Sequence, residues 1–259
     1  MRKFLIAGNW KMNLDRAESV DLAAKIVAKL PKSCPVEISV IPTLVHLEAV
    51  HAALAGTAVQ LGAQNVYFEK KGAFTGEVSA AILRDMGVRY VLAGHSERRH
   101  ILGETDETVG KKAHAIVTEG LGLILCVGET LEQRQNFKTV EIVGRQLDAG
   151  LAHIAAAGVE AGHLVIAYEP VWAIGTGLTA TPAQAQEVHA FIRTKLDEKY
   201  GLGLAETIRI QYGGSAKKAN AAELLAQKDI DGLLIGGASL MADEFMGIVQ
   251  AAVSAQPGH

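Results

Sequence analysis

The chain has 259 residues, of which 49% are hydrophobic and 20% are charged, so it can bury a sizeable core and differs from disordered sequences. Its formal net charge of −3 offers no basic face, and we therefore expect no nucleic acid among its partners. No apolar run approaches the roughly 18 residues that a membrane span requires, so we also expect no membrane association.

The first apolar stretch of the chain is short and ends at Asn9-Trp10-Lys11. A secretory signal peptide would have a longer apolar region and a cleavage site with small residues. The two cysteines, Cys34 and Cys126, lie far apart and lack the spacing of metal ligands, which favours a reducing compartment. We therefore expect a soluble, cytoplasmic protein.

Short apolar runs alternate along the chain with longer amphipathic segments. The runs predicted as strands are Phe4–Ala7, Val36–Ile41, Val59–Gly62, Tyr90–Ala93, Leu123–Val127, Leu164–Tyr168, Ile208–Gln211 and Gly232–Ile235. The segments predicted as helices are Ala17–Leu30, Leu44–Leu54, Ser79–Met86, Glu107–Glu119, Thr139–Ala155, Pro182–Leu196, Ala221–Ala226 and Leu240–Ala252. The clearest helix start is Thr181-Pro182-Ala183-Gln184, a capping box with proline at the first helical position.

These elements form eight strand–helix pairs of about 32 residues each, a normal size for such a unit. No linker or change of composition divides the chain, so we predict a single domain over residues 1–259. Strict alternation predicts an α/β fold, a (β/α)₈ barrel with a closed, parallel, eight-stranded sheet. An open, doubly wound sheet with fewer strands fits the same alternation and stays open as an alternative.

Both architectures place function in the loops that follow the carboxyl ends of the strands. Polar residues and glycines gather at these positions, namely Asn9, Lys11, Gln64, Asn65, His95–Arg98, Glu129, Glu169, Gly213–Ser215, Gly236 and Gly237. The glycine pairs after the last two strands would let backbone N–H groups approach an anion closely. The sequence therefore predicts a phosphate site at this end of the fold.

Three of these side chains are candidates for acid–base or anion chemistry. Glu169 leaves a buried strand directly before a proline, where partial desolvation would raise its basicity, although a salt-bridged strand end is the alternative. His95 also follows a strand, but a lone histidine is commonly a surface or core residue. Lys11 could bind an anionic substrate or be a surface cation. No histidine spacing supports a metal site.

The stretch Pro170–Gly177 follows the sixth predicted strand and contains glycine, threonine and tryptophan. Gly175 to Ala180 matches the pattern G-x-G-x-x-A of dinucleotide-binding proteins, but the match is weak because other residues separate it from the strand and the next helix begins only at Pro182. We predict instead that Pro170–Gly177 forms a hinged lid over a ligand.

The segment Gln64–Val78 is longer than a usual barrel loop. It could be a mobile surface excursion. However, Phe74 and Val78 are apolar and have no evident core to join, which favours a partner that covers them.

Five segments resemble, in the same order, the signature segments of the triosephosphate isomerase family. They are Ala7–Asn13, Gly94–Arg99, Ala167–Gly177, Tyr212–Ser215 and Asp231–Leu240. Together they span nearly the whole chain, and the segment around Glu169 is highly specific. One departure is Ala216-Lys217-Lys218, where the family more commonly has Val-Lys-Pro, and it lies outside the predicted chemistry.

The resemblance implies a (β/α)₈ (TIM) barrel that interconverts dihydroxyacetone phosphate and glyceraldehyde 3-phosphate through an enediolate, an activity of glycolysis and gluconeogenesis. It implies no cofactor and no metal. By resemblance, Glu169 is the base, and neutral His95 polarises the carbonyl group. Asn9 and Lys11 bind the substrate, and Glu97 supports Lys11. The residues that would bind the phosphate are Gly175, Ser215, Gly236 and Gly237.

The resemblance also implies a homodimer. In the family, the segment that corresponds to Gly72–Glu77 docks into the neighbouring subunit, and Thr75 would reach the partner's active site near its copies of Asn9 and His95. The small phosphorylated triose and a second copy of the chain are thus the expected partners.

Two other functions stay open. A different phosphate-binding barrel enzyme, such as an aldolase or another isomerase, is one; a Schiff-base aldolase would need a buried lysine on a strand, and the predicted strands contain none. A non-catalytic barrel is the other, but it would be expected to lack Glu169, His95 or Lys11, and all three are present.

Overall fold

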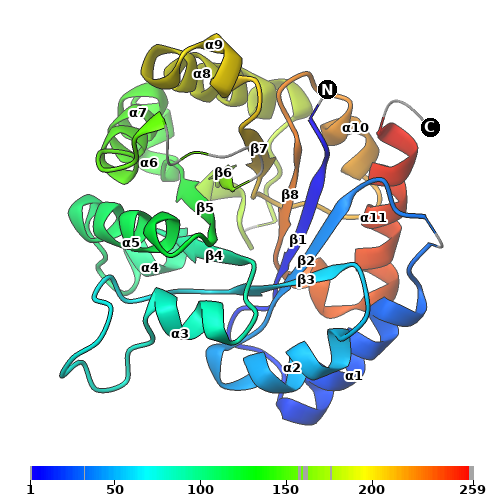
Figure 1. Cartoon of the computed structure of the whole chain (residues 1–259). Coiled ribbons are helices and arrows are strands. Elements are labelled where there is room, and N and C mark those ends of the chain that lie inside the picture. The colour runs from blue at the N-terminus through cyan, green and yellow to red at the C-terminus, as the bar shows by residue number, and fades with distance from the viewer. Residues whose placement is uncertain (1, 32, 157–158, 160–162, 176, 257–259) are drawn as a thin grey trace.

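The computed structural model describes residues 2–31, 33–156, 159, 163–175 and 177–256, and eight parallel strands in it close into a barrel (Figure 1). The strands are β1 (Leu5–Asn9), β2 (Glu37–Ile41), β3 (Val59–Ala63), β4 (Tyr90–Ala93), β5 (Gly122–Val127), β6 (Leu164–Tyr168), β7 (Arg209–Tyr212) and β8 (Gly232–Ile235). They pair in chain order, and β8 returns to β1. The predicted closed parallel barrel is confirmed, and the open sheet is wrong. The single domain over 1–259 stays a prediction, and residues 1, 32, 157, 158, 160–162, 176 and 257–259 of it lie outside the described residues.

Helices surround the strands on the outside of the barrel (Figure 1). The α-helices are α1 (Arg16–Ala28), α2 (Leu47–Leu54), α3 (Ala80–Asp85), α4 (Ser96–His100), α5 (Asp106–Thr118), α6 (Leu131–Gln135), α7 (Thr139–Gly150), α8 (Pro182–Tyr200), α9 (Leu202–Ala205), α10 (Ala221–Leu225) and α11 (Ala242–Ala255). The described 3₁₀ turns are η1 (Leu44–His46), η3 (Val171–Ala173) and η4 (Gly237–Leu240). The short helices α4, α6 and α9 were not predicted, and four or five residues give only a weak helical period. Of the helices of this length, α10 was predicted, from the apolar segment Ala221–Ala226.

Two helix boundaries show how local sequence fixes the elements. At the start of α8, the Thr181 side chain accepts the Gln184 N–H, the Gln184 side chain accepts the Thr181 N–H, and Pro182 is the first helical residue, as predicted. The predicted end of α7 at Ala155 is wrong, because the helix stops at Gly150. Leu151 and Ile154 prolonged the apolar pattern, but they are buried in the turn that follows.

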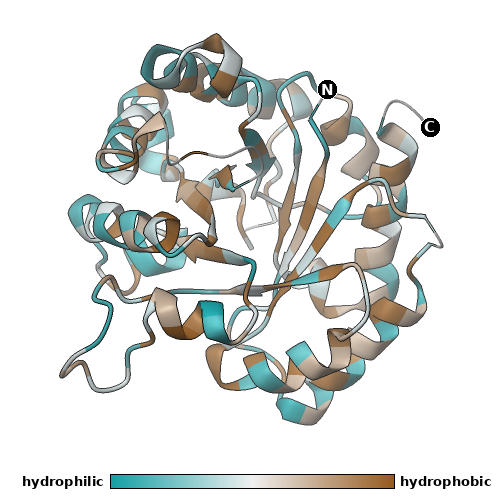
Figure 2. Ribbon diagram, in the orientation of Figure 1, coloured by the Kyte–Doolittle hydropathy of each residue, from teal (hydrophilic) through white to brown (hydrophobic). Residues whose placement is uncertain are grey.

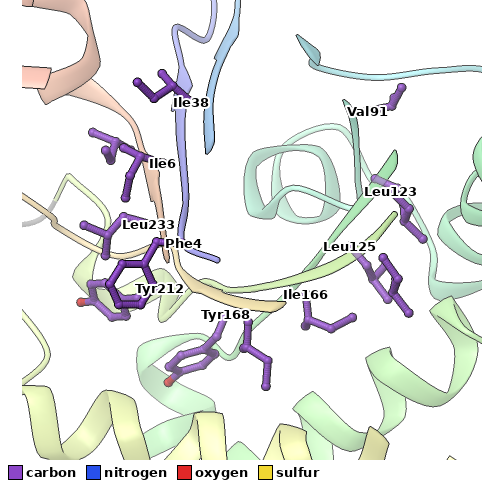
Figure 3. Packing of buried hydrophobic residues seen from close by; sticks show 14 of the residues in the cluster. Phe4, Ile6, Ile38, Val91, Leu123, Leu125, Ile166, Tyr168, Tyr212 and Leu233 are labelled. Carbon is purple, nitrogen blue, oxygen red and sulfur yellow. The ribbon is translucent and has the colours of Figure 1, made fainter. Parts of the chain in front are cut away.

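The strands contribute to two buried layers, because successive side chains of a strand point to opposite faces. On β6, Ile166 and Tyr168 pack outward against the helices, as Figure 3 shows, whereas Val165 and Ala167 fill the barrel interior. The strands are accordingly mostly apolar, while hydrophilic residues gather on the helices (Figure 2). Both faces of the sheet are therefore covered, as the apolar runs predicted.

The amino end of the barrel interior is closed by a polar cluster. The Arg209 guanidinium donates to the Tyr90 hydroxyl at 2.6 Å and to Glu37 Oε2 at 2.7 Å. Tyr90 in turn donates to the other oxygen of Glu37 at 2.9 Å. Arg209 and Tyr90 are buried, and these hydrogen bonds give their polar groups partners in an interior where an unpaired polar group would be destabilising.

The segment between β3 and α3 extends away from the barrel as a long loop (Figure 1). Phe74 in this loop is 39% exposed and packs on Tyr67, with ring centroids 4.7 Å apart. The expectation that Val78 has no core to join is wrong, because Val78 is partly buried and packs against the main apolar cluster. Among the described residues, no helix combines the length and apolar character needed to cross a membrane.

Candidate active site

A cavity of about 660 Å³ lies at the carboxyl ends of the strands. Its lining includes eight of the ten predicted site residues, namely Asn9, Lys11, His95, Glu169, Gly175, Ser215, Gly236 and Gly237. Glu97 is not part of the lining but contacts Lys11. Thr75 is exposed on the long loop after β3 and does not line the cavity. The fold thus brings all predicted catalytic and phosphate-binding residues to one place and leaves the predicted dimer residue outside it.

The strand period explains why two of the polar side chains face the cavity. Leu5 and Ala7 point into the barrel, so Asn9, two residues on, continues the inward row at the end of β1. Val165 and Ala167 likewise precede Glu169. Both side chains are almost fully buried, at 4% exposure for Asn9 and 2% for Glu169.

Lys11 is held over the cavity by a constrained turn. Its φ angle is +53°, a left-handed conformation that is uncommon for a residue with a side chain. The Asn9 Oδ1 atom accepts the Lys11 N–H at 3.0 Å, and Gln64 Nε2 donates to the Lys11 carbonyl at 2.8 Å. The ammonium group donates to Glu97 Oε1 at 2.7 Å. These contacts fix both the backbone and the charged end of Lys11.

Glu169 contacts two groups at the start of α4. Its Oε1 atom lies 2.9 Å from Nε2 of His95, and its Oε2 atom accepts the Ser96 N–H at 2.9 Å. His95 is the N-cap of α4, and its Nδ1 atom accepts the Glu97 N–H at 3.2 Å. Because Nδ1 is an acceptor, the proton of the neutral ring is on Nε2, where it faces the cavity and Glu169.

The two side chains shift one another's protonation. Burial alone would raise the pKa of Glu169, but His95 and the Ser96 N–H outweigh it and hold the pKa of this carboxyl below its usual value. The sequence-based expectation of a raised basicity is therefore wrong for this arrangement. Burial lowers the pKa of His95, and the adjacent Glu169 carboxylate overrides that effect and raises it.

Glycines at the ends of β7 and β8 allow close packing around the cavity. A Cβ atom on Gly213 would lie 2.9 Å from Cγ of Glu169, so a side chain there would displace the carboxylate. A Cβ atom on Gly236 would come within 3.3 Å of Cε of Lys11. The backbone of Gly236 therefore lies beside a cation, an arrangement that favours a bound anion. Gly175 has a φ of +69°, which a side chain would strain.

Sequence analysis did not connect Glu129 with the predicted lid, although it noted Glu129 as a strand-end residue. The Glu129 carboxylate is buried and accepts hydrogen bonds from the Tyr168 hydroxyl at 3.1 Å and from Trp172 Nε1 at 3.0 Å. Arg134 contacts the same carboxylate at 3.1 Å. The polar strand-end position was the available indication for Glu129; Arg134, on a helix of five residues, gave none.

Within the part of the chain that the structure describes, no group of three or more His, Cys, Asp or Glu side chains is arranged to bind a metal ion. The polar groups of the cavity are instead a carboxylate, an imidazole, an ammonium and glycine-rich backbone. Such a set suits an anionic substrate and proton transfer at carbon.

Comparison with known proteins gives one consistent result. The sequence model of the family described as triosephosphate isomerase matches residues 4–252. The chain is 52% identical to the triosephosphate isomerase of Rhodopirellula baltica over 254 residues, which are 98% of this chain and 99% of that protein. It is 51% identical to that of Carboxydothermus hydrogenoformans (98% and 100% covered) and 49% identical to that of Alkaliphilus oremlandii (96% and 99% covered). The chain therefore belongs to the triosephosphate isomerase family.

Proposed function

We propose that the cavity at the strand ends is where this enzyme, an intramolecular aldose–ketose isomerase, interconverts dihydroxyacetone phosphate and D-glyceraldehyde 3-phosphate, a step of glycolysis and gluconeogenesis. Family membership over nearly the whole chain supports this activity. The observation that carries the residue roles is the contact of Glu169 with Nε2 of His95 at 2.9 Å, inside a cavity that also holds Lys11. A base, a neutral donor and a cation are then within reach of one small substrate.

The proton transfer needs a base at carbon and a donor at oxygen together. Glu169 removes a proton from C1 of dihydroxyacetone phosphate, and the electron pair of that bond forms the enediolate while negative charge develops on the C2 oxygen. The Nε2–H of His95 and the ammonium of Lys11 stabilise this oxygen. The C2 oxygen then takes a proton from Nε2 of His95, and Nε2 takes the proton of the C1 hydroxyl, so that the negative charge moves to the C1 oxygen. As the C1 carbonyl forms, Glu169 returns its proton to C2, which gives the aldehyde and leaves both residues in their starting protonation states.

Glu169 must leave its contacts with His95 and Ser96 to reach a substrate carbon. Those contacts are what hold its pKa down, and burial alone would raise it. Once the carboxylate moves to the substrate, burial also becomes the main effect on His95 and favours the neutral ring. Substrate entry thus makes Glu169 a stronger base and keeps His95 a neutral donor.

The phosphate would bind at the backbone of Gly236, Gly237 and Ser215, near the Lys11 ammonium, with Gly175 of the lid on the other side. Since the phosphate does not react, its binding energy can orient the substrate and order the lid. We define the lid as Pro170–Gly177; Thr176 within it lies outside the described residues.

The homodimer is part of the proposal. Large apolar side chains are exposed on the long loop after β3, on α3 that follows it, and in the loops after β1 and β2; they are Phe74 at 39%, Ile82 at 51%, Met12 at 92% and Val45 at 85%. Their exposure is unfavourable for an isolated subunit. Thr75 is exposed on the same loop and would contact the partner's site. The cytoplasm is the proposed location, since glycolytic substrates are found there.

A coupled assay with dihydroxyacetone phosphate and a glyceraldehyde 3-phosphate reporter enzyme, with a metal chelator present, tests the activity. Steady turnover with no nucleotide other than the one that the reporter enzyme uses supports the proposal. A Schiff-base aldolase would instead be trapped by borohydride with substrate, but none of the eight strands carries the lysine that it requires. Absence of isomerisation would overturn the proposed function.

Deletion of Gly72–Gly76 tests the dimer. We expect the sedimentation coefficient to fall to that of a monomer and kcat to fall with it, because a misplacement of about 1 Å in Lys11 or His95 can lower the rate about 10²-fold. Thermal unfolding checks that the variant is folded. A folded monomer with full activity would show that the loop is dispensable.

A further inference from the structure

The amino-terminal part of the lid is attached to Glu129, at the end of β5, by two hydrogen bonds. Trp172, in η3, donates its Nε1–H to Glu129, and the Val171 N–H donates to the Glu129 carbonyl at 3.1 Å. Glu129 therefore accepts from the lid through both its side chain and its backbone. Any residue that fixes this carboxylate also fixes the start of the lid.

Arg134 contacts both partners of this attachment. Its guanidinium donates to Glu129 Oε1 at 3.1 Å, and its Cζ atom lies 4.8 Å from the centroid of the Trp172 ring. The Glu129 side chain is fully buried, whereas that of Arg134 is 23% exposed. A buried carboxylate needs an opposite charge nearby, and a cation over an indole ring is attracted to its face.

The attachment has a consequence for the phosphate site. Ile174 and Gly175, immediately after η3, line the same cavity as Gly236 and Gly237. The part of the lid that follows Trp172 therefore belongs to the cavity in which the phosphate would bind. Contacts that hold Trp172 in place lower the entropic cost of ordering the lid when a ligand binds.

We propose that Arg134 is a positioning residue that orders the lid over the phosphate site, by neutralising Glu129 and by stacking on Trp172. The inference rests on the proposed isomerase function. Arg134 does not line the cavity, and its contacts with Glu129 and Trp172 connect it to the site through the lid. Its effect should accordingly appear with phosphorylated ligands and be absent with a substrate that has no phosphate.

The test compares Arg134→Met with the unaltered enzyme on D-glyceraldehyde 3-phosphate and on D-glyceraldehyde. Methionine keeps an apolar stem and removes the charge. We expect KM for the phosphorylated substrate and Kd for phosphoglycolate to rise about 10-fold, the usual size for one charged contact, with kcat/KM for D-glyceraldehyde unchanged. Arg134→Lys keeps the charge but not the planar stack, and we expect it to restore part of the loss.

Arg145→Met is the matched control, since Arg145 also forms an ion pair, with Asp106 at 2.9 Å, but contacts no part of the lid. A second readout is the fluorescence of Trp172 in a Trp10→Phe background, where it is the remaining tryptophan of the two. We expect its emission to change in Arg134→Met and not in Arg145→Met.

An equal loss on both substrates, or no loss on either, would overturn the role of Arg134. If Arg134→Met does not fold, the same two substrates are compared with Arg134→Lys. We then expect a smaller rise in KM, confined to the phosphorylated substrate. Failure of the unaltered enzyme to turn over D-glyceraldehyde 3-phosphate would instead refute the proposed function, so the two failures are distinguishable.

Discussion

The two ends of the barrel interior use polar side chains in opposite ways. At the amino end, Arg209, Tyr90 and Glu37 hydrogen bond to one another. At the carboxyl end, Glu169 and His95 face a cavity, where their contacts can be exchanged for a substrate. The comparison teaches that buried polar groups stabilise the fold where they are mutually satisfied, and serve chemistry where one partner can be replaced.

The largest expected effect separates activity from stability at the carboxyl end. Glu169→Gln keeps the size of the side chain and removes the base, so we expect kcat to fall about 10²–10⁴-fold. The midpoint of thermal unfolding should change little, and phosphoglycolate should still bind detectably by calorimetry. Turnover close to that of the unaltered enzyme would remove Glu169 from the mechanism.

The opposite pattern is expected at the amino end. Arg209→Met leaves the partly buried Glu37 carboxylate without its guanidinium, and we expect the free energy of unfolding to fall by about 3 kcal/mol in urea titrations. KM and kcat measured below the unfolding transition should be unchanged. Adding Glu37→Gln should regain part of the lost stability. A loss of kcat without a loss of stability would contradict the division between the two ends.

A pH effect is expected from the layer between the barrel and its helices. His189 in α8 is fully buried, and burial lowers its pKa from 6.5 to about 4. Between these values the unfolded chain binds a proton that the folded protein does not, so stability falls as the pH falls from about 6.5 to 4, by about 3 kcal/mol in total. Above about pH 6.5 both states leave His189 neutral, so the stability no longer depends on this group.

His189→Asn should flatten this dependence, since the asparagine amide can still donate to the Asp229 carbonyl that lies 3.0 Å from Nδ1 of His189. The free energy of unfolding is measured by urea titration at several pH values in both proteins. Equal slopes with pH would show that His189 does not cause the acid sensitivity. Activity at neutral pH should be the same in both.

The smallest effect is expected at the surface. Thr181→Ala removes one half of the capping box of α8, and we expect a loss of about 1 kcal/mol in the free energy of unfolding. Because Thr181 lies just beyond the lid, KM for the phosphorylated substrate should be recorded as well. We expect KM to be unchanged. A rise in KM for the phosphorylated substrate would show that Thr181 also holds the lid in position.

The sequence could predict the barrel because its strands are short, apolar on both faces and regularly spaced. It could also predict the positions of Asn9 and Glu169, since each continues the inward row of a strand. It could not predict the contact of Glu169 with His95, which depends on the turn at Gly94 and on the start of α4, nor the resulting direction of the pKa shift of Glu169. The contact and the direction of the pKa shift both depend on distances between atoms that only the folded structure gives.

Arg134 illustrates a different limit. It lies on a helix too short for periodicity, and an arginine there is ordinarily a surface cation. Its two partners come from the end of β5 and from the lid after β6, which the parallel pairing of these two strands brings together. Pairings between loops of different strands are therefore the part of the site that the fold adds to the sequence.

The most direct test of the central claim is isotope exchange during isomerisation in deuterium oxide. If Glu169 at the carboxyl end carries a proton between C1 and C2, it can exchange with solvent in the enediolate state. We therefore predict that glyceraldehyde 3-phosphate formed from dihydroxyacetone phosphate contains deuterium at C2, seen by proton NMR, and that Glu169→Gln loses both the isomerisation and the exchange. Efficient isomerisation with no deuterium at C2 would indicate a direct hydride shift and contradict the account.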